Sequence, residues 1–282
     1  MSLPTEISKK ITAIQEQQRE QQMSLPFDDW VERLRAAPNK LLRSALFGVV
    51  KPGRRRYVKE MVLPMVGEFS LAYTGERLDQ ADEDIFLQVV HFARQRTVSD
   101  EISFPARRLL REIKRKTSGA DYKWLHGRLV ALAACAMTIR DGKGRTLITG
   151  GLIRDSGYDE MTGEFKCRLN PYMRGLFSED EYTLIDWGDR LALGGKQLAK
   201  WLQRFYASHT KPHALKVATL MELCGSESAD LKHFRADLRK ALEELRVRGT
   251  VVRSWRIGND DLVHVVTIPS ASQARRLARG GT

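Results

Sequence analysis

The sequence predicts an α+β protein in which one unit of helices and a β-hairpin occurs twice behind a polar leader. Residues 1–26 are poor in apolar side chains, and such a segment buries too little surface to offset the entropy of ordering it. Beyond them, stretches with helical spacing of apolar residues alternate with β-branched stretches, and this order recurs in the second half of the chain. With 282 residues, 42% of them hydrophobic, the chain is long enough to form two cores.

The first unit begins with a helix whose acidic start and basic end suit the helix dipole. Pro105 stands near the first turn of the next helix, where its missing N–H costs least. The expected elements are a helix over 81–96, an extended stretch over 102–104, helices over 105–114 and 120–134, a hairpin around the turn 141–144 and a strand over 165–169.

The second unit repeats this order, and Gly225 and Gly249 stand where its helices are expected to end. Its expected elements are a helix over 196–209, a short strand and a helix within 214–225, a longer helix over 229–249 and a hairpin over 250–268. Helix, short strand, helix, helix and hairpin is the plan of a winged helix, a helix-turn-helix variant with a β wing. We therefore predict two tandem winged-helix domains, over 38–180 and 181–282, after a flexible leader over 1–37.

Charge and composition narrow the class of partner. The excess of 47 Lys and Arg over 35 Asp and Glu, a net charge of +12, favours a polyanion, and nucleic acid is the first candidate. No apolar run approaches the roughly 18 residues of a membrane-spanning helix, and the N-terminus lacks the apolar region of a signal peptide. We therefore expect a cytoplasmic protein without a membrane partner. Cys135, Cys167 and Cys224 are widely spaced and odd in number, so we expect buried thiols and neither disulfides nor a zinc site.

Cations that could contact DNA lie on the third helix of each unit and on both hairpins. In the helix over 229–249, Phe234 and Leu238 belong to an apolar face, and cations recur on another face. The N-terminal end of such a helix enters the major groove, and hairpin cations suit phosphates or the minor groove. The candidate DNA-binding residues are Lys123, Trp124, Arg128, Lys143, Arg145, Lys232, His233, Arg235, Arg239, Arg253 and Arg256. A solvated basic face is the alternative for any one of them, and their joint placement favours DNA.

Several long phrases also resemble the TrfA family of plasmid replication initiators. They are LRSALF at 42–47, RRRY at 54–57, YTGERLDQADEDIF at 73–86, LNPYMRGLF at 169–177, an almost uninterrupted stretch over 185–227 and FRADLRKALEEL at 234–245. The resemblance runs from about residue 38 to residue 245 and is weakest in the hairpins and from Arg246 onward.

This resemblance implies tandem winged-helix domains that bind double-stranded DNA sequence-specifically at directly repeated origin sites called iterons. It further implies that the protein opens the adjacent A+T-rich DNA and recruits the host initiator and replicative helicase. Monomers are implied to be the iteron-binding form, and homodimers are implied to restrain plasmid copy number.

The end of the leader contains QMSLPF at 22–27, which resembles the Gln-x-x-Leu-x-Phe pattern of bacterial sliding-clamp ligands. Gln22, Leu25 and Phe27 satisfy this pattern. Leu25 and Phe27 can enter an apolar cleft while the Gln22 amide makes directional hydrogen bonds. A flexible tether lets such a peptide reach the clamp while the body stays on DNA. The alternative is a hydrophobic segment that packs on the first domain.

We assign no catalytic residue, metal ligand or cofactor. An ATPase needs a GxxxxGK[ST] loop, and GGK at 194–196 lacks both the spacing and the hydroxyl. The His pair of a rolling-circle nickase is absent from the sequence, and His264 fits a strand. The acids Asp79, Asp82, Glu83 and Asp84 stand at a helix start, which favours a dipole role over a metal site. A winged-helix transcriptional repressor is the alternative function, and the clamp pattern and the TrfA-like phrases favour an initiator.

Overall fold

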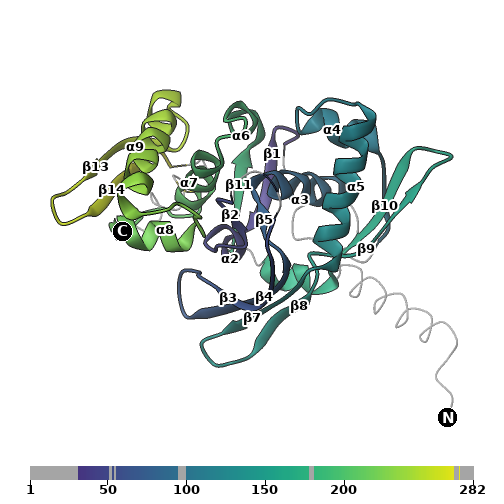
Figure 1. Cartoon of the computed structure of the whole chain (residues 1–282), viewed down its shortest axis with the longest axis horizontal. Coiled ribbons are helices and arrows are strands. Elements are labelled where there is room, and N and C mark those ends of the chain that lie inside the picture. The colour runs from purple at the N-terminus through teal and green to yellow at the C-terminus, as the bar shows by residue number, and fades with distance from the viewer. Residues whose placement is uncertain are drawn as a thin grey trace, which may run out of the picture.

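The computed structural model describes residues 31–50, 53, 55–94, 100–177, 181–269 and 273. Two winged helices lie side by side, with a further sheet beside the first of them (Figure 1). Gln22, Leu25 and Phe27 fall outside the described residues.

The first winged helix has the predicted order of elements. It consists of α3 (Gln80–Ala93), β6 (Ile102–Pro105), α4 (Ala106–Glu112), α5 (Gly119–Ala134), β9 (Ile153–Asp159) and β10 (Glu164–Leu169). Its sheet has the order β6-β10-β9, with Phe104 of β6 opposite Phe165 of β10. Both rings are buried in the same core as Leu125 and Leu129 of α5. The apolar spacing along α5 therefore determines which of its faces points to solvent.

The second winged helix has the same topology. It consists of α7 (Gln197–Ala207), β12 (Leu215–Lys216), α8 (Val217–Leu223), α9 (Leu231–Arg248), β13 (Val252–Ile257) and β14 (Leu262–Thr267). Its sheet order is β12-β14-β13, so the short strand again pairs with the second strand of the hairpin. Gly249 ends α9 with φ of 64°, a left-handed conformation that favours glycine. The predicted fold class, α+β with two tandem winged helices, is confirmed.

The predicted hairpin around 141–144 exists, but its assignment as the first wing is wrong. It joins β7 (Ala136–Asp141) to β8 (Thr146–Gly150) in a separate sheet of order β3-β4-β7-β8, with β3 at Tyr57–Leu63 and β4 at Phe69–Glu76. Two hairpins follow α5 along the chain, and only the second, β9–β10, pairs with β6 as a wing does. The pairing partner decides which hairpin is the wing, and local sequence does not contain that information.

The remaining elements join the two halves. They are β1 (Leu34–Pro38), α2 (Asn39–Leu42), β2 (Phe47–Gly48), β5 (Leu78–Asp79), the 3-10 helix η1 (Pro171–Leu176), β11 (Tyr182–Asp186) and α6 (Trp187–Ala192). β1 pairs antiparallel with β11, and Ala36 and Ala37 are buried. Residues 34–37, which we expected in the leader, therefore belong to the folded body because they add a strand to β11.

Two expectations are confirmed, a role of Asp79 and Asp82 at the start of α3 and the burial of the cysteines. Asp79 caps α3 by accepting hydrogen bonds from Ala81 N at 2.8 Å and Asp82 N at 3.1 Å, and the Asp82 carboxylate accepts one from Asp79 N at 2.9 Å. All three cysteines are buried and free. Burial raises the pKa of the Cys167 and Cys224 thiols to about 12, so both stay protonated at neutral pH.

Candidate nucleic-acid interface

Helix α9 presents a cationic face to solvent. Phe234 and Leu238 are buried in the second core, and successive residues of a helix are about 100° apart. Lys232, Arg239 and Lys240 consequently point away from that core, and all three are exposed. Lys240 was absent from our predicted set, although the same helical spacing places it off the apolar face of Phe234 and Leu238.

Two predicted residues of α9 have internal partners. His233 Nδ1 lies 2.8 Å from a carboxylate oxygen of Asp230, the N-cap residue of α9. The Arg235 guanidinium donates from Nε to Asp261 Oδ1 at 3.1 Å and from Nη2 to Asp261 Oδ2. Among the described residues, no ion pair is made by Lys232 or Arg239. The two unpaired cations are therefore the better candidates for groove contacts.

The second wing carries its cations on β13. Arg253 and Arg256 are exposed, whereas Trp255 between them is half-buried and donates from Nε1 to Glu243 at 3.1 Å. The wing projects at one end of the molecule, and the first wing projects at the other (Figure 1). Its turn contains the acids Asp260 and Asp261, so the positive charge lies along the strand and not at the tip.

Helix α5 occupies the equivalent position in the first winged helix. Most of its predicted DNA-binding residues contact other residues of the protein. The Arg115 guanidinium stacks 3.6 Å from the centroid of the Trp124 ring. Arg128 donates to Glu76 of β4 at 2.9 Å. Lys123 alone of the three predicted residues is exposed, and it makes no ion pair with the residues that the structure describes. Around it the outward face of α5 contains small and apolar residues, namely Gly127, Val130, Ala131 and Ala134.

Lys143 and Arg145 lie in the turn between β7 and β8, outside both winged helices. Lys143 is exposed, and Arg145 pairs with Asp141 at 2.7 Å in the same turn. The true first wing presents two other exposed cations, Arg154 on β9 and Lys166 on β10. We missed both because the wrong hairpin was taken for the wing.

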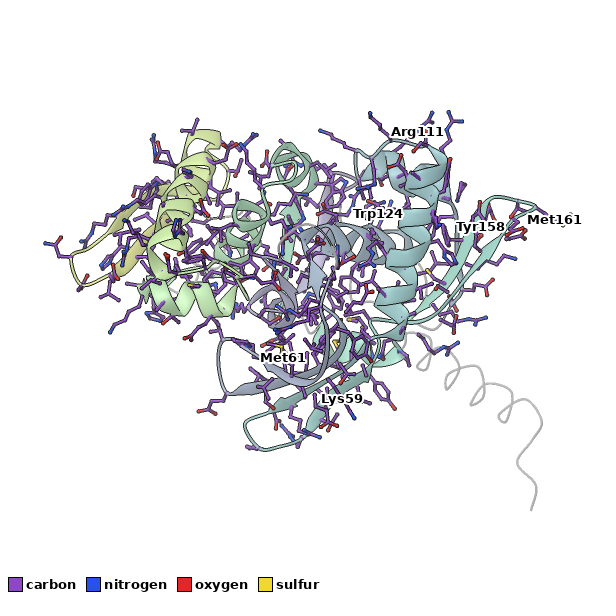
Figure 2. All side chains as sticks on the ribbon, viewed as in Figure 1. Lys59, Met61, Arg111, Trp124, Tyr158 and Met161 are labelled. Atoms are coloured by element: carbon purple, nitrogen blue, oxygen red, sulfur yellow. The ribbon has the colours of Figure 1, made fainter. Side chains whose placement is uncertain are left out.

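A small groove separates α5 from the first wing. Its volume is about 250 Å³, and it is lined by Tyr122, Lys123, His126, Tyr158, Glu160 and Phe165. Tyr158 packs on Phe165 with ring centroids 4.8 Å apart, and Met161 at the tip of the wing is 98% exposed (Figure 2). No sequence pattern predicted this groove, because its aromatic residues come from α5 and from a hairpin that lies further along the chain.

A larger hollow of about 790 Å³ borders the other flank of α9. His233, Asp237 and Lys240 line one side, and Val50 and Leu198 form part of its floor. Charges of both signs surround it, in contrast to the outward face of α9, which presents mainly cations.

A buried ion cluster fixes the two winged helices relative to each other. Arg190 of α6 pairs with Asp84 at 2.7 Å and with Glu83 at 3.1 Å, and all three side chains are at most 7% exposed. Arg204 of α7 pairs with the same Glu83 at 3.0 Å, and Lys200 pairs with Asp84. Glu83 and Asp84, which we attributed to the helix dipole, therefore join α3 to α6 and α7.

The arginines of this joint remain cationic at neutral pH. Burial lowers the pKa of Arg204 to about 10, against the attraction of Glu83. Burial also lowers the pKa of Arg190, but Asp84 and Glu83 outweigh it and the net shift is upward. Arg204 additionally donates to the carbonyls of Leu41 at 2.9 Å and Leu42 at 2.6 Å. The orientation of α9 relative to α5 is thus held by buried charges that form ion pairs.

Within the described residues, no helix is long and apolar enough to cross a bilayer. The same part of the chain contains no group of three or more His, Cys, Asp or Glu side chains that could hold a metal ion.

The geometry defines a class: a tandem winged-helix protein whose second unit presents a cationic third helix and wing. A model of the TrfA protein family matches residues 6–267. The plasmid replication initiator protein TrfA of Escherichia coli is 30% identical over 260 residues, which cover 88% of this chain and 66% of that protein. The chain therefore belongs to the TrfA family, and it spans about two thirds of the length of this relative.

A solved structure, domains 2 and 3 of RctB, supports the fold. Domains 2 and 3 of RctB match with a TM-score of 0.52 at 11% identity, covering 82% of this chain and 96% of that one. The Pi initiator protein, solved in complex with iteron DNA, matches with a TM-score of 0.47 at 14% identity over 71% of this chain and 99% of that one.

Proposed function

We propose that this protein is a plasmid replication initiator that binds iterons as a sequence-specific double-stranded DNA-binding protein. The observation that carries the proposal is the exposed cationic face of α9, in the helix position that enters the major groove in helix-turn-helix proteins. The family membership supports it, because the E. coli relative is named as a plasmid replication initiator.

In this mechanism α9 reads base edges. Arg239 can make a bidentate contact with guanine, and Lys232 and Lys240 can reach bases or phosphates. Arg253 and Arg256 contact flanking phosphates from the second wing, and Lys123 of the first winged helix contacts the backbone nearby. Because phosphate neutralisation releases counterions, affinity should fall steeply with salt.

Later steps use host proteins. In the proposal, iteron binding promotes opening of A+T-rich origin DNA and recruits the host initiator and replicative helicase in the cytoplasm. Monomers bind the iterons, and homodimers restrain copy number. No chemical step is assigned to the protein itself.

The leader supplies a clamp ligand in this proposal. Gln22, Leu25 and Phe27 bind the host sliding clamp, with Leu25 and Phe27 in an apolar cleft. Phe27→Ala should abolish clamp binding in a pull-down with purified clamp and leave iteron affinity unchanged. Loss of both activities would mean that Phe27 belongs to the folded body.

The function is tested by a fluorescence titration of the full chain against iteron-containing origin DNA and against a shuffled duplex, at near-physiological salt without nucleotide. We expect a preference for the repeats of a few hundredfold or more, within the usual range of specific over non-specific binding. Equal binding to both duplexes would contradict the initiator proposal and leave a generic basic DNA-binding protein. If the repeats are preferred, an origin-dependent replication assay separates an initiator from a transcriptional repressor, which would bind without supporting replication.

A further inference from the structure

One ion pair joins α9 to the turn of the second wing. Arg235 Nε donates to one carboxylate oxygen of Asp261 and Nη2 donates to the other, and the two side chains are 27% and 37% exposed. Such two-point contacts between arginine and a carboxylate add geometric specificity to the charge attraction. The pair therefore fixes a distance and an angle between the helix and the wing.

Asp261 is itself held in place by the backbone. Its φ of 63° is left-handed, its N–H donates to Gly258 O at 3.1 Å, and its carbonyl accepts from Val217 N at 3.0 Å. The turn is consequently tied to the start of α8 by the main chain and to α9 by Arg235. Without Arg235, the contact between the wing turn and α9 would lose its charged side-chain link.

The ion pair with Asp261 separates Arg235 from Lys232 and Arg239, which project from neighbouring directions of α9. Arg235 follows the buried Phe234 by one residue, about 100° around the helix, whereas Ala236 follows by about 200° and points outward. Lys232 and Arg239 lie between these two directions, about 60° and 40° around the helix from Arg235. Arg235 thus projects from the flank of α9 that faces the wing, and two of its donor nitrogens are already engaged by Asp261.

The charge of the wing gives the pair a second consequence. The turn carries two acids, and an uncompensated Asp261 would repel the phosphates that Arg253 and Arg256 are proposed to contact. Arg235 neutralises this carboxylate. Asp260 is turned to the backbone, where it accepts a hydrogen bond from Leu262 N at 3.2 Å.

We propose that Arg235 is a positioning residue: it holds the second wing against α9 and neutralises Asp261, so that Arg253 and Arg256 reach phosphates beside the bases that α9 reads. It does not itself read a base. This inference rests on the proposed DNA-binding function.

A double-mutant cycle in the full chain tests the inference, with Arg235→Ala, the pair Arg253→Ala/Arg256→Ala, and all three changes combined. Because Arg235 acts through the wing, we expect Arg235→Ala to weaken binding to repeat and shuffled DNA alike, roughly tenfold. The combined variant should bind about as well as Arg235→Ala alone. The slope of log affinity against log salt concentration should be smaller in magnitude for Arg235→Ala by roughly 1.8, because two phosphate contacts are lost. A purely structural role would not change this slope in protein shown to be folded by circular dichroism.

A variant in which the charges of Arg235 and Asp261 are exchanged shows whether lost DNA binding comes from the missing ion pair or from misfolding. Arg235→Glu alone places two carboxylates together and should bind poorly, whereas Arg235→Glu/Asp261→Arg should recover most of the affinity with an unchanged base preference. Additive losses in the cycle, or a loss from Arg235→Ala confined to one base pair of the repeat, would overturn the inference and make Arg235 a base reader. Failure of the proposed function is seen separately, in unmodified protein that does not distinguish repeats from shuffled DNA.

Discussion

Helices α5 and α9 occupy the same position in two winged helices of the same sheet order, yet they present different surfaces. On α5, Trp124 lies under Arg115 and Arg128 pairs with Glu76, so these side chains hold the helix to its own domain. On α9, Lys232 and Arg239 are exposed, and the residues that the structure describes offer them no ion-pair partner. A shared topological position therefore does not imply shared chemistry, and an internal partner decides whether a cation is available to DNA.

The largest expected effect concerns the joint that holds the two helices in a fixed relation. Arg190→Ala leaves Glu83 and Asp84 buried with a missing partner, and breaking a buried pair in this way typically costs about 3–5 kcal/mol. Urea unfolding should show this loss as a lower midpoint.

A matched control is available on the surface. Arg33 pairs with Asp186 at 3.9 Å, and its side chain is 77% exposed, so Arg33→Ala should cost under about 1 kcal/mol. If Arg190→Ala lowered the free energy of unfolding by no more than Arg33→Ala, the joint would not fix the two winged helices relative to each other. Helices α5 and α9 would then belong to independently oriented units.

A smaller effect should come from two histidines, the buried His91 on α3 and the half-buried His209 just after α7. Burial, followed by the charges of Arg43 and His213, lowers the pKa of His209 to about 4. The unfolded chain binds this proton below about pH 6.5 and the folded chain only near pH 4, so stability is lost as pH falls through that window and is unaffected above it. For His209 the loss at pH 4 is at most about 3 kcal/mol.

His209→Asn removes the titration and leaves a donor near the position of Nδ1, which lies 2.7 Å from Phe205 O. Its unfolding free energy should fall less steeply between pH 6.5 and 4 than that of the unmodified protein. His91 adds a loss of the same sign, since burial lowers its pKa to about 4. Asp82 opposes both, because burial and then Asp79 raise its pKa to about 6. Identical slopes in the variant and the unmodified protein would show that His209 is not buried as a neutral group.

The difference between α9 and α5 is tested directly by Arg239→Ala and Lys123→Ala. A lost bidentate base contact costs about 1–3 kcal/mol and relaxes preference at one position, so Arg239→Ala should weaken repeat binding more than shuffled binding. Lys123→Ala should weaken both equally and by less. Arg246→Ala is the control on α9, because Arg246 already pairs with Glu243, with Nε 2.9 Å from Oε2. A loss of base preference in Lys123→Ala, but not in Arg239→Ala, would reverse the assignment of the reading helix.

Local patterns predicted much of this molecule. Apolar spacing placed both third helices, and the caps at Asp79 and Gly249 lie where charge and glycine indicated. These features depend on residues within one or two turns of each other, so the chain contains them locally. The exposure of Lys232 and Arg239 on α9 was predicted for the same reason.

Long-range pairing was not predictable in this way. The wing of the first unit is defined by β10 lying beside β6, and residues 34–37 are folded because β11 lies beside β1. The partners of Arg128 and Arg235 come from β4 and from the second wing. Helical spacing predicts the face of the helix on which a cation lies. It does not predict whether a carboxylate from a distant part of the chain forms an ion pair with that cation.

The smallest expected effect concerns the corrected wing and separates two surfaces of the first half. Lys166 lies exposed on β10 of the true wing, and Lys143 lies exposed in the β7–β8 turn of the four-stranded sheet. If the first winged helix approaches DNA as the second does, Lys166→Ala should weaken repeat and shuffled binding alike by a few fold and flatten the salt slope by about 0.9, the loss of one phosphate contact. Lys143→Ala should then have less effect on either duplex. A larger effect of Lys143→Ala than of Lys166→Ala would place the four-stranded sheet against the DNA. The two winged helices would then have the same fold but bind DNA through different surfaces.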